Sequence, residues 1–599
     1  MTNSTPEQFY AIRISELLAE NGKQNKKKSQ LTWFRFFSLL LAFATAWMLW
    51  PYGQLFALTA FFILIGLFIY FLKQDINNNA AIENTKRLIA INETEQLVLQ
   101  HQFFQLTDGS KYQPVSHPYT NDLDIFGRAS LYQYINRTTA EQGNAAIASW
   151  LIEPSTVPVL LQRQEAAKEL AVKTNWRQQL QAYGVADAIT ISTEQKISNW
   201  LAEENKFIHN SFWEILRIVL PAISLGVLGL YIAGFIDSNK FFPVATLLMI
   251  IAFSISKKVI PAHSKLSKIS PQLETLSTSI AWIEQATFNS SFLQQLKNVF
   301  AHHSEKASQQ IKGLTRILER LDLRLNIVVF IPLNTFLFWD LQQVFALEKW
   351  KENNKQNISN WFKGLADMEA ISSIGNLTFN HPAWVFPVIS KEEAVFESDN
   401  LGHPLIPKDK RVDNTFSTKG VNQLNLVTGS NMAGKSTFLR SIGINMVLAM
   451  MGAPVCAGKL TLSPMKVMSS MRISDNLEES TSTFYAELKK LKEIIEAVNR
   501  NEKVFLLLDE ILRGTNSADR HIGSKSLIKQ LIHHKAAGVL ATHDLELAKM
   551  AAAYPENIQN YHFDVQVTND ELYFDYKLKT GICQSMNASI LMKKIGIEL

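Results

Sequence analysis

The segment from Phe36 to Leu72 contains no charged residue, and no other feature constrains the fold of this chain as strongly. Pro51-Tyr52-Gly53 divides the segment into two apolar halves, each near the ~20 residues that a helix needs to cross a bilayer. Because backbone amides must be paired internally when lipid surrounds them, we expect a helical hairpin. A cleavable signal peptide would hold an apolar stretch of only about 7–15 residues, so the much longer segment found here does not fit one.

A second apolar stretch predicts a second hairpin, with Ile218–Ile236 as its first half and Phe241–Ser256 as its second. The turn between the halves is the polar segment Asp237-Ser238-Asn239-Lys240. The second half is short for a membrane span and contains Pro243, so a buried helical core is the alternative.

A third apolar run, Ile327–Trp339, is shorter still and contains Pro332 and Asn334, so we interpret it as buried core. Basic residues flank the two predicted hairpins, whereas their turns hold only Lys240. By the positive-inside tendency, both ends of the chain face the cytoplasm, which predicts a multi-pass protein of the inner (cytoplasmic) membrane. The flanking residues are Lys23, Lys26, Lys27, Lys28, Arg35, Lys73, Arg217, Lys257, Lys258, Lys265 and Lys268.

Composition narrows the possible classes of protein. Apolar residues make up 47% of the chain and charged residues 19%, which excludes an intrinsically disordered chain. The formal net charge of +5 identifies no partner by itself, and a strongly basic DNA clamp would carry more. Cys456 and Cys583 lie far apart without CxxC spacing, so a disulfide framework and a Cys-based zinc site are excluded and a reducing compartment fits.

Outside the hairpins the pattern changes from helical to α/β along the chain. Apolar residues recur at helical spacing from Ile311 to Leu325, which predicts one long amphipathic helix. From Leu424 onward, short apolar strands alternate with helices, as is typical of a parallel sheet in an α/β domain. A basic stripe on the amphipathic helix either meets phosphates of DNA or lipid headgroups or is a solvated face; it comprises Lys312, Arg316, Arg320 and Arg324.

We therefore expect an all-α region that carries two transmembrane helical hairpins and is followed by an α/β domain with a parallel sheet. The expected boundaries are 1–30 for a cytoplasmic N-terminal segment, 31–73 and 213–257 for the two hairpins, 77–212 and 258–375 for the two parts of the helical region, and 376–599 for the α/β domain.

The α/β region contains a match to the phosphate-binding motif G-x-x-x-x-G-K-S, placed between the apolar strand Leu424–Thr428 and a predicted helix. Its glycines let backbone N–H groups wrap the phosphates, and the helix N-terminus adds a partial positive charge. Lys435 is expected to reach the β- and γ-phosphates of ATP, and Ser436 to ligate Mg²⁺. The predicted nucleotide-binding residues are Gly429, Ser430, Asn431, Met432, Ala433, Gly434, Lys435, Ser436 and Thr437.

Two further strands end in polar side chains that can act on a bound triphosphate. The strand Val504–Leu508 leads into Asp509, which we expect to hold Mg²⁺, and Glu510, which we expect to orient the attacking water or accept its proton. A third strand leads through Thr542 into His543, the position of a γ-phosphate sensor. Since ligands bind outside the carboxyl ends of parallel strands, Lys435, Glu510 and His543 are the predicted catalytic residues. Helix capping for the acids and a structural role for the histidine are the alternatives.

These motifs and their order resemble the MutS family of DNA mismatch repair ATPases. The matching runs are TGSNMAGKSTFLRSIG, Asp475-Asn476-Leu477, Ser482-Thr483-Phe484-Tyr485-Ala486-Glu487, DEILRGTNSADR and ATHDLELA. Upstream, Leu401-Gly402-His403-Pro404-Leu405 resembles the His-Pro segment that leads into the family's ATPase domain, and Asp122 to Leu151 resembles the start of the MutS core and lever region. The resemblance covers roughly residues 120–599.

The resemblance implies a Mg²⁺-dependent, dimeric ATPase with two composite sites. It places Ser482, or its neighbour Thr483, against the γ-phosphate held by the opposite subunit, and it places His403 near the adenine.

The sequence also departs from the family's pattern. Ser430 stands where the family usually has Pro and Ala433 where it usually has Gly, but both are small and leave the loop workable. Leu512 and Arg520 replace glycines near the two acids. Nothing before residue 120 resembles the mismatch-reading domain, and the second hairpin, Ile218–Ser256, interrupts the core where the DNA clamp is normally inserted. The departures put mismatch recognition in doubt without touching ATP hydrolysis.

Two functions fit these observations. The first is a membrane-anchored MutS-like ATPase whose ATP-dependent homodimer binds double-stranded or structured DNA in mismatch repair or recombination. The alternative is a membrane ATPase or scaffold that uses the same dimer switch on a non-DNA partner, as a transporter-like or a lipid- or protein-remodelling machine. The sequence has no LSGGQ-like signature before Asp509 and no charges within the hairpins that could mark a substrate path, which argues against a transporter.

Overall fold

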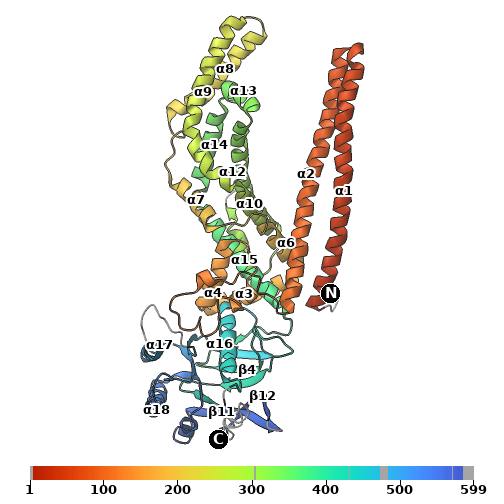
Figure 1. The fold of residues 1–599 in the computed structure, drawn as a ribbon. Helices are drawn as coiled ribbons and strands as arrows, with labels where there is room; N and C mark the ends of the chain where they lie inside the picture. The colour runs from red at the N-terminus through yellow and green to blue at the C-terminus, as the bar shows by residue number, and fades with distance from the viewer. Residues whose placement is uncertain (1–4, 303–304, 431, 473–482, 569–570, 584–599) are drawn as a thin grey trace.

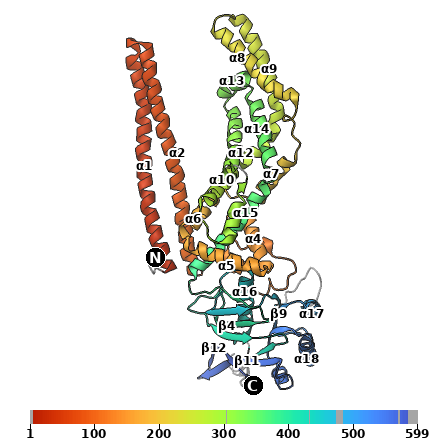
Figure 2. The same ribbon diagram turned by 180° about the vertical axis from the view of Figure 1, so that it is seen from behind.

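A computed structural model describes residues 5–302, 305–430, 432–472, 483–568 and 571–583 of the chain. Two helical arms point away from the C-terminal α/β domain, toward the same end of the molecule (Figure 1). The view from behind shows the same separation of the two arms (Figure 2). The first arm comprises α1 (Pro6–Leu49), η1 (Trp50–Tyr52) and α2 (Gln54–Leu99), and the tip of the second comprises α8 (Ser211–Ile232), α9 (Ser238–Leu266) and α13 (Ile327–Leu337).

The first arm is a pair of helices packed along their length, and both extend well beyond the predicted apolar hairpin. Helix α2 runs through the expected domain boundary near residues 73–77 without a break. An ion pair between Arg35 and Asp75 joins the two helices just below their apolar part. At the foot of the arm, the Tyr10 hydroxyl donates a hydrogen bond of 2.6 Å to the side-chain oxygen of Asn380 in the helical body. The arm is therefore attached to the rest of the chain at its polar end.

The second arm differs from the sequence prediction at α13. The run from Ile327 was interpreted as buried core, but the side chains of Ile327 and Val328 are 67% and 77% exposed. Only one face of α13 packs against α8 and α9, which is why the apolar side chains on the opposite face are uncovered. The interpretation of this run as core is therefore wrong for its first turn.

Four stretches of the described residues are helical and are long and apolar enough to cross a membrane, judged by length and composition alone: Pro6–Tyr52, Gln54–Leu99, Ser211–Ile232 and Ser238–Gln285. Helix α13 and α14 (Trp339–Asn354) meet the same criterion together but are bent by 79° where they join. Large apolar side chains stand exposed at both tips, among them Trp47, Leu55, Ile63, Ile223 and Ile250.

The helical body lies between the arms and the α/β domain (Figure 1). Its longer helices are α4 (Glu141–Ile152), α5 (Val157–Val172), α6 (Thr174–Gly184), α7 (Ile191–Ala202), α10 (Ser270–Gln285), α11 (Ser291–Asn298), α12 (Ala307–Asp322), α14 and α15 (Ile358–Asn380). Short elements complete it: η2 (Ser110–Tyr112), α3 (Leu131–Ile135), η3 (Ser267–Ile269), β1 (Ala301–His302), β2 (Glu305–Lys306) and η4 (Leu323–Leu325). A buried ion pair of 2.5 Å joins Arg137 to Glu95 at the end of α2.

The predicted amphipathic helix ends earlier than its apolar spacing suggests. Helix α12 buries Ile311 and Leu318 but stops at Asp322, and Leu325 is exposed because the chain turns there through η4. Arg324 leaves the predicted basic stripe, since its guanidinium pairs with the buried Asp340 carboxylate at 2.5 Å. The stripe is thus reduced to Lys312, Arg316 and Arg320, which are exposed.

The C-terminal domain is built on a six-stranded sheet with the order β12-β11-β6-β10-β9-β8, in which β12 is antiparallel to β11 and the other neighbours are parallel. Its strands are β6 (Leu424–Thr428), β8 (Lys466–Ser470), β9 (Val504–Asp509), β10 (Ala537–Thr542), β11 (Ile558–Thr568) and β12 (Glu571–Thr580). A four-stranded sheet has the order β3-β7-β4-β5, with β3 (Val388–Ile389), β4 (Phe396–Leu401), β5 (Asn414–Thr418) and β7 (Lys459–Leu462). The predicted combination of a helical region and an α/β domain is confirmed.

Helices cover both faces of the six-stranded sheet. α16 (Lys435–Met451) packs on one face with Val427, Leu507 and Val539. Side chains from α17 (Thr483–Asn499) and α18 (Ser517–His533) cover the other face, and α19 (Leu545–Ala548) and η5 (Lys549–Ala552) adjoin it. Every residue of β6, β9 and β10 is buried as a result, so these strands read as continuous apolar runs in the sequence.

The helical body is joined to the α/β domain by a buried carboxylate. Asp122 accepts hydrogen bonds from the Ser469 hydroxyl (2.7 Å) and from the backbone N–H of Met471 and Arg472 (3.2 Å each). The Lys490 ammonium of α17 pairs with the same carboxylate at 2.6 Å. The end of β8 and helix α17 are therefore tied to the segment that precedes α3.

Candidate functional site

The carboxyl ends of three neighbouring strands bring the predicted site residues together. Thr428 at the end of β6 lies beside Thr542 of β10, and Ala541 lies beside Asp509 of β9. The residues that follow these strands must consequently emerge at one edge of the sheet. The adjacency of Gly429, Glu510 and His543 in space follows from parallel pairing.

The loop between β6 and α16 adopts backbone angles that favour glycine. Gly429 has φ +149°, and a Cβ there would lie 2.9 Å from the backbone oxygen of Phe563. Gly434 has φ +103° and closes the loop immediately before Lys435 begins α16. The first N–H groups of α16 have no partner within the helix, so the loop and the helix start together offer donors to an anion.

The Lys435 ammonium folds back over this loop. It donates hydrogen bonds to the backbone oxygens of Gly429 (2.8 Å) and Ser430 (2.9 Å) and lies 3.3 Å from Nδ1 of His543. Burial lowers the pKa of Lys435, and the nearby carboxylates of Glu510 and Asp509 oppose that shift. A charged phosphate in the loop would replace neutral carbonyl partners of this ammonium by an anionic one.

Ser436 and Asp509 form a paired set of oxygen donors. The Ser436 hydroxyl donates to Oδ2 of Asp509 at 2.5 Å. The other carboxylate oxygen, Oδ1, is buried without a partner among the described residues. Burial raises the pKa of Asp509, while the hydrogen bond from Ser436 opposes the shift. An unpartnered buried carboxylate oxygen beside a hydroxyl suits a hard cation such as Mg²⁺.

Glu510 is held between two cationic or donor side chains. His543 Nε2 contacts one of its carboxylate oxygens, and Arg513 pairs with the other at 2.8 Å. Burial alone would raise the pKa of Glu510, but the His543 hydrogen bond and the charge of Arg513 outweigh it and lower the pKa. His543 is itself fixed through Nδ1, which donates to the backbone oxygen of Gly429 at 2.9 Å. Glu510 is thus kept ionised and oriented.

Lys435, Ser436 and Glu510 line a cavity of about 700 Å³. His403, Lys410 and Arg411 line the same cavity, so the predicted adenine residue and the phosphate loop share one hollow. Burial lowers the pKa of His403 to about 4, assisted by Arg440 and Arg411, so its imidazole is neutral near pH 7. The remaining lining residues are Leu401, Ile406, Val412, Asn414, Ser430, Met432, Gly434, Thr437, Phe438, Ser441, Arg513, Phe563 and Tyr576.

Several residues of the site were not predicted from the sequence. Arg513 is one turn beyond Asp509-Glu510, a spacing that could have drawn attention to it. Tyr576 of β12 places its ring so that a Cβ at Gly434 would lie 3.1 Å away, a contact that only the antiparallel return of β12 creates. Glu487 of α17 accepts a hydrogen bond from the Leu512 N–H and so holds the turn after β9. Leu512, noted as a replacement for glycine, has φ +62°.

The remaining predicted residues take the following places. Ala433 is buried and Met432 is exposed within the loop, with Met432 at φ +69°, and Thr437 lies in the first turn of α16. Asn431, Ser482 and Asp475-Asn476-Leu477 lie outside the described residues. Among the described residues, there is no group of three or more His, Cys, Asp or Glu side chains that could hold a metal ion. A metal at this site would therefore depend on Ser436, Asp509 and the nucleotide.

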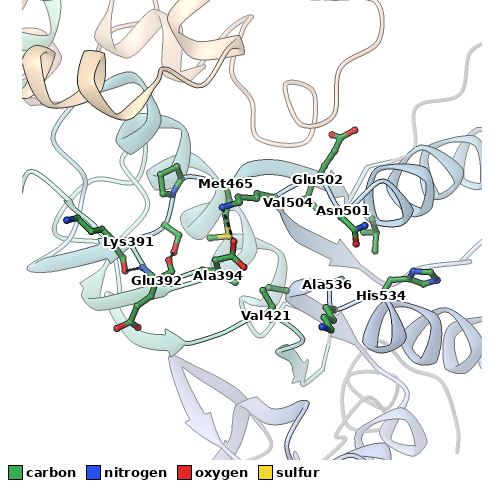
Figure 3. A pocket seen from close by; sticks show the side chains of 18 residues that line it. Lys391, Glu392, Ala394, Val421, Met465, Asn501, Glu502, Val504, His534 and Ala536 are labelled. Atoms are coloured by element: carbon green, nitrogen blue, oxygen red, sulfur yellow. Dashed lines mark hydrogen bonds and ion pairs between the residues drawn. The ribbon is translucent and has the colours of Figure 1, made fainter.

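A second hollow, of about 400 Å³, lies at the opposite edge of the sheet and contains none of the predicted site residues (Figure 3). It is lined by Val504 and Ala537, the first residues of β9 and β10, together with polar side chains such as Lys391, Glu502 and His534. Strand direction distinguishes the two cavities, because only the first lies at the carboxyl ends of the parallel strands.

A parallel sheet whose central strand leads through a glycine-rich loop into a buried helix defines a nucleotide-binding type of α/β domain. Residues 425–595 match the family description "MutS domain V". In this domain the chain is similar to proteins of the MutS family.

The similarity to known proteins is confined to part of each chain. MutS protein homolog 4 of Homo sapiens is 35% identical over 205 residues, which is 32% of this chain and 22% of the human protein. The Mus musculus protein of the same name is 35% identical over 196 residues, covering 31% and 20% of the two chains. DNA mismatch repair protein MutS of Treponema pallidum is 29% identical over 244 residues, covering 39% and 26%. The matched part spans about a quarter or less of these relatives.

Proposed function

We propose that the α/β domain binds and hydrolyses ATP with Mg²⁺. The observation that carries this proposal is that Lys435, Ser436 and Glu510 line one cavity at the carboxyl ends of β6, β9 and β10. Asp509 contacts Ser436, and His543 contacts Glu510 and lies beside Lys435. These residue types are the ones with which phosphoryl-transfer domains supply a cation, a metal ligand and a group that orients water.

The residues around the phosphate loop suit the steps of this reaction. Lys435 exchanges the backbone oxygens of Gly429 and Ser430 for the β- and γ-phosphates, a move of its ammonium within the same loop. Ser436 and Asp509 would hold Mg²⁺, which neutralises charge developing on the phosphates. Glu510 orients the attacking water, because His543 and Arg513 keep its carboxylate ionised and fixed in direction.

We propose that the active form is a homodimer with two composite sites. In this proposal Ser482 or Thr483 approaches the γ-phosphate of the partner's site, as the family resemblance implies. His403, neutral and lining the same cavity as Ser436, is assigned to the adenine.

We further propose that the two arms anchor the chain in the inner (cytoplasmic) membrane, with the α/β domain in the cytoplasm. The apolar ends of both arms lie at the same end of the molecule, away from that domain (Figure 1). Both tips expose large apolar side chains that a bilayer would cover, and basic residues precede and follow them in the sequence. Residues 31–73 and 213–257 are the proposed membrane segments.

The first proposed use of the ATP cycle is binding of double-stranded or structured DNA. The name of the Treponema pallidum relative, DNA mismatch repair protein MutS, supports it. The alternative is action on a membrane-associated, non-DNA partner, and one observation favours it. The exposed stripe Lys312, Arg316 and Arg320 leads directly to the apolar α13, so it suits lipid phosphates as well as DNA.

One experiment tests both the ATPase proposal and the DNA proposal. It measures ATP turnover of the detergent-purified chain with and without duplex, mismatched and branched DNA. Turnover that depends on Lys435 supports the ATPase proposal, and its stimulation by one DNA structure supports the DNA proposal. Turnover unaffected by every DNA but changed by anionic vesicles would favour the membrane alternative.

A further inference from the structure

Besides its two long helices, α8 and α9, the tip of the second arm contains a shorter apolar helix, α13. Its inner face is fixed to them by polar as well as apolar contacts. The Asn334 side-chain amide donates to the Ser256 hydroxyl of α9 at 2.9 Å, and the Ser224 hydroxyl of α8 donates to the backbone oxygen of Phe336 at 2.5 Å. The Asn334 amide and the Ser224 hydroxyl are thus paired within the protein, as an apolar environment requires.

None of the described residues forms an element that covers the outer face of α13. Ile327 and Val328 are largely exposed, and Leu325, just before the helix, is 82% exposed. These side chains adjoin the exposed apolar surface of α8 and α9, which includes Ile223 and Ile250. Scattered exposed apolar residues are ordinary, but a contiguous apolar surface calls for a partner.

The chain enters and leaves α13 from the same side. Helices α12 and α14 pack against each other in opposite directions, because Trp339 donates to the Arg320 backbone oxygen (2.8 Å) and Trp350, farther along α14, donates to that of Gln310 (2.6 Å). The ion pair between Arg324 and Asp340 joins the segment that enters α13 to the segment that leaves it. A full membrane span through α13 would separate α12 from α14, which is incompatible with their packing.

The length of α13 agrees with partial insertion. Its 11 residues form a helix of roughly 16 Å, about half of the ~30 Å hydrocarbon core. The 79° bend to α14 follows at Phe338, which has φ +48°. The segment therefore has the dimensions and the return path of a re-entrant helix.

We propose that α13 is a re-entrant membrane helix whose outer face contacts the acyl chains of the bilayer that holds α8 and α9. This inference rests on the proposed membrane anchoring and adds a third inserted element to it. The occupant of the exposed face is lipid, because that face is continuous with the surface of two helices that are themselves long and apolar enough to span. In this arrangement the basic stripe of α12 lies at the headgroup level.

A depth measurement in vesicles tests the proposal. Cys456 and Cys583, both buried, are first replaced by alanine. Single cysteines are then introduced and labelled with an environment-sensitive fluorophore in the full chain reconstituted into phosphatidylcholine vesicles. The sites are Val328→Cys on α13, Ile63→Cys on α2 and Ile250→Cys on α9 as anchor positions, and the exposed Gln295→Cys on α11 as the polar control.

Brominated acyl chains should reduce fluorescence at Val328→Cys as strongly as at Ile63→Cys and Ile250→Cys, and leave Gln295→Cys unchanged. Loss of fluorescence at the two anchor positions without loss at Val328→Cys would overturn the re-entrant helix while leaving the anchoring proposal in place. Absence of quenching at all of these positions would overturn the anchoring proposal and this one with it.

The direction of the chain is tested separately with Lys312→Cys on α12 and Lys349→Cys on α14, both exposed. A membrane-impermeant maleimide added to sealed vesicles should label the two cysteines from the same side. Labelling from opposite sides would show a full span and contradict the re-entrant path.

Discussion

The sheet of the α/β domain and the tips of the arms are both rich in apolar residues, yet their side chains have opposite environments. In β6, β9 and β10 every residue is buried, because two layers of helices cover the sheet. At the tips, Ile63 and Val328 are exposed although their helices pack well on one side. The sheet is thus covered by helices of the same chain, whereas no element among the described residues covers the exposed faces of the tips.

The same contrast applies to polar groups. At the edge of the sheet, charged side chains gather around a cavity, and Asp509 keeps one buried oxygen unpartnered. At the second tip, the buried Asn334 amide and Ser256 are paired with each other. One region is arranged to receive a charged ligand and the other to exclude water, which separates a catalytic part from a proposed anchoring part.

Replacing Lys435 by alanine should give the largest effect on the catalytic side of this contrast. ATP turnover should fall by about 10³-fold, because the β/γ-phosphate charge loses the ammonium that the loop now holds. Steady-state phosphate release measures the effect, and flotation of the same variant with vesicles is the control. Unchanged turnover would remove this cavity as the ATPase site.

Glu510→Gln should lower turnover by about 10²-fold while ATP still binds, because an amide neither orients nor deprotonates water as a carboxylate does. We expect retained labelled ATP after rapid gel filtration and an increased dimer fraction by light scattering. Arg513→Gln is the matched comparison, since it leaves the carboxylate in place but removes its 2.8 Å partner, and should cost less. A Glu510→Gln variant that stays monomeric with bound ATP argues against composite sites.

A pH titration probes the joint between the helical body and the α/β domain. Burial lowers the pKa of His381 to about 3, and its ring lies 2.8 Å from the Tyr134 hydroxyl and stacks on Trp384. The unfolded chain therefore binds this proton more readily than the folded one. Stability should fall as the pH decreases from about 6.5 towards 3, by an amount on the order of 5 kcal/mol from this group.

Thermal unfolding at pH 7 and pH 5 measures this dependence. His381→Gln, which keeps a hydrogen-bonding side chain but does not titrate, should lose less stability over that interval than the unaltered chain. An equal loss in the two proteins would mean that His381 takes up its proton without cost in the folded state.

Charge reversal of Arg316 and Arg320 should give the smallest effect, because both side chains are exposed and salt screens them. Affinity for duplex DNA or for anionic vesicles should decrease, together with its dependence on salt. Arg324 is left unaltered, since removing it would leave the buried Asp340 unpaired. If the charge-reversed variant binds both DNA and anionic vesicles as the unaltered chain does, the stripe is a solvated face.

Much of this architecture follows from local sequence, and the exceptions have physical causes. The buried strands, the glycine-rich loop and the acids after β9 were predicted because each depends on a few neighbouring residues. The exposed face of α13 was not, since apolar sequence alone does not distinguish a core helix from one that ends uncovered. Arg324 was placed on a stripe by spacing, but α12 ends before it.

Contacts between distant segments were also beyond sequence reasoning. Tyr576 enters the nucleotide cavity only because β12 returns antiparallel to β11. Glu487 was noted only as part of a matching run, and its hydrogen bond to the Leu512 N–H depends on how α17 packs beside β9. The length of α1 and α2 was underestimated, because polar residues can continue a helix that apolar residues begin.

Flotation combined with ATP turnover tests the central claim most directly. The chain is reconstituted into vesicles, separated on a density gradient, and supplied with ATP and Mg²⁺ from outside. We expect the floated fraction to hydrolyse ATP, and the Lys435→Ala chain to float equally but to hydrolyse ATP about 10³-fold more slowly. A chain that remains at the bottom of the gradient, or one that floats with turnover independent of Lys435, would contradict the account.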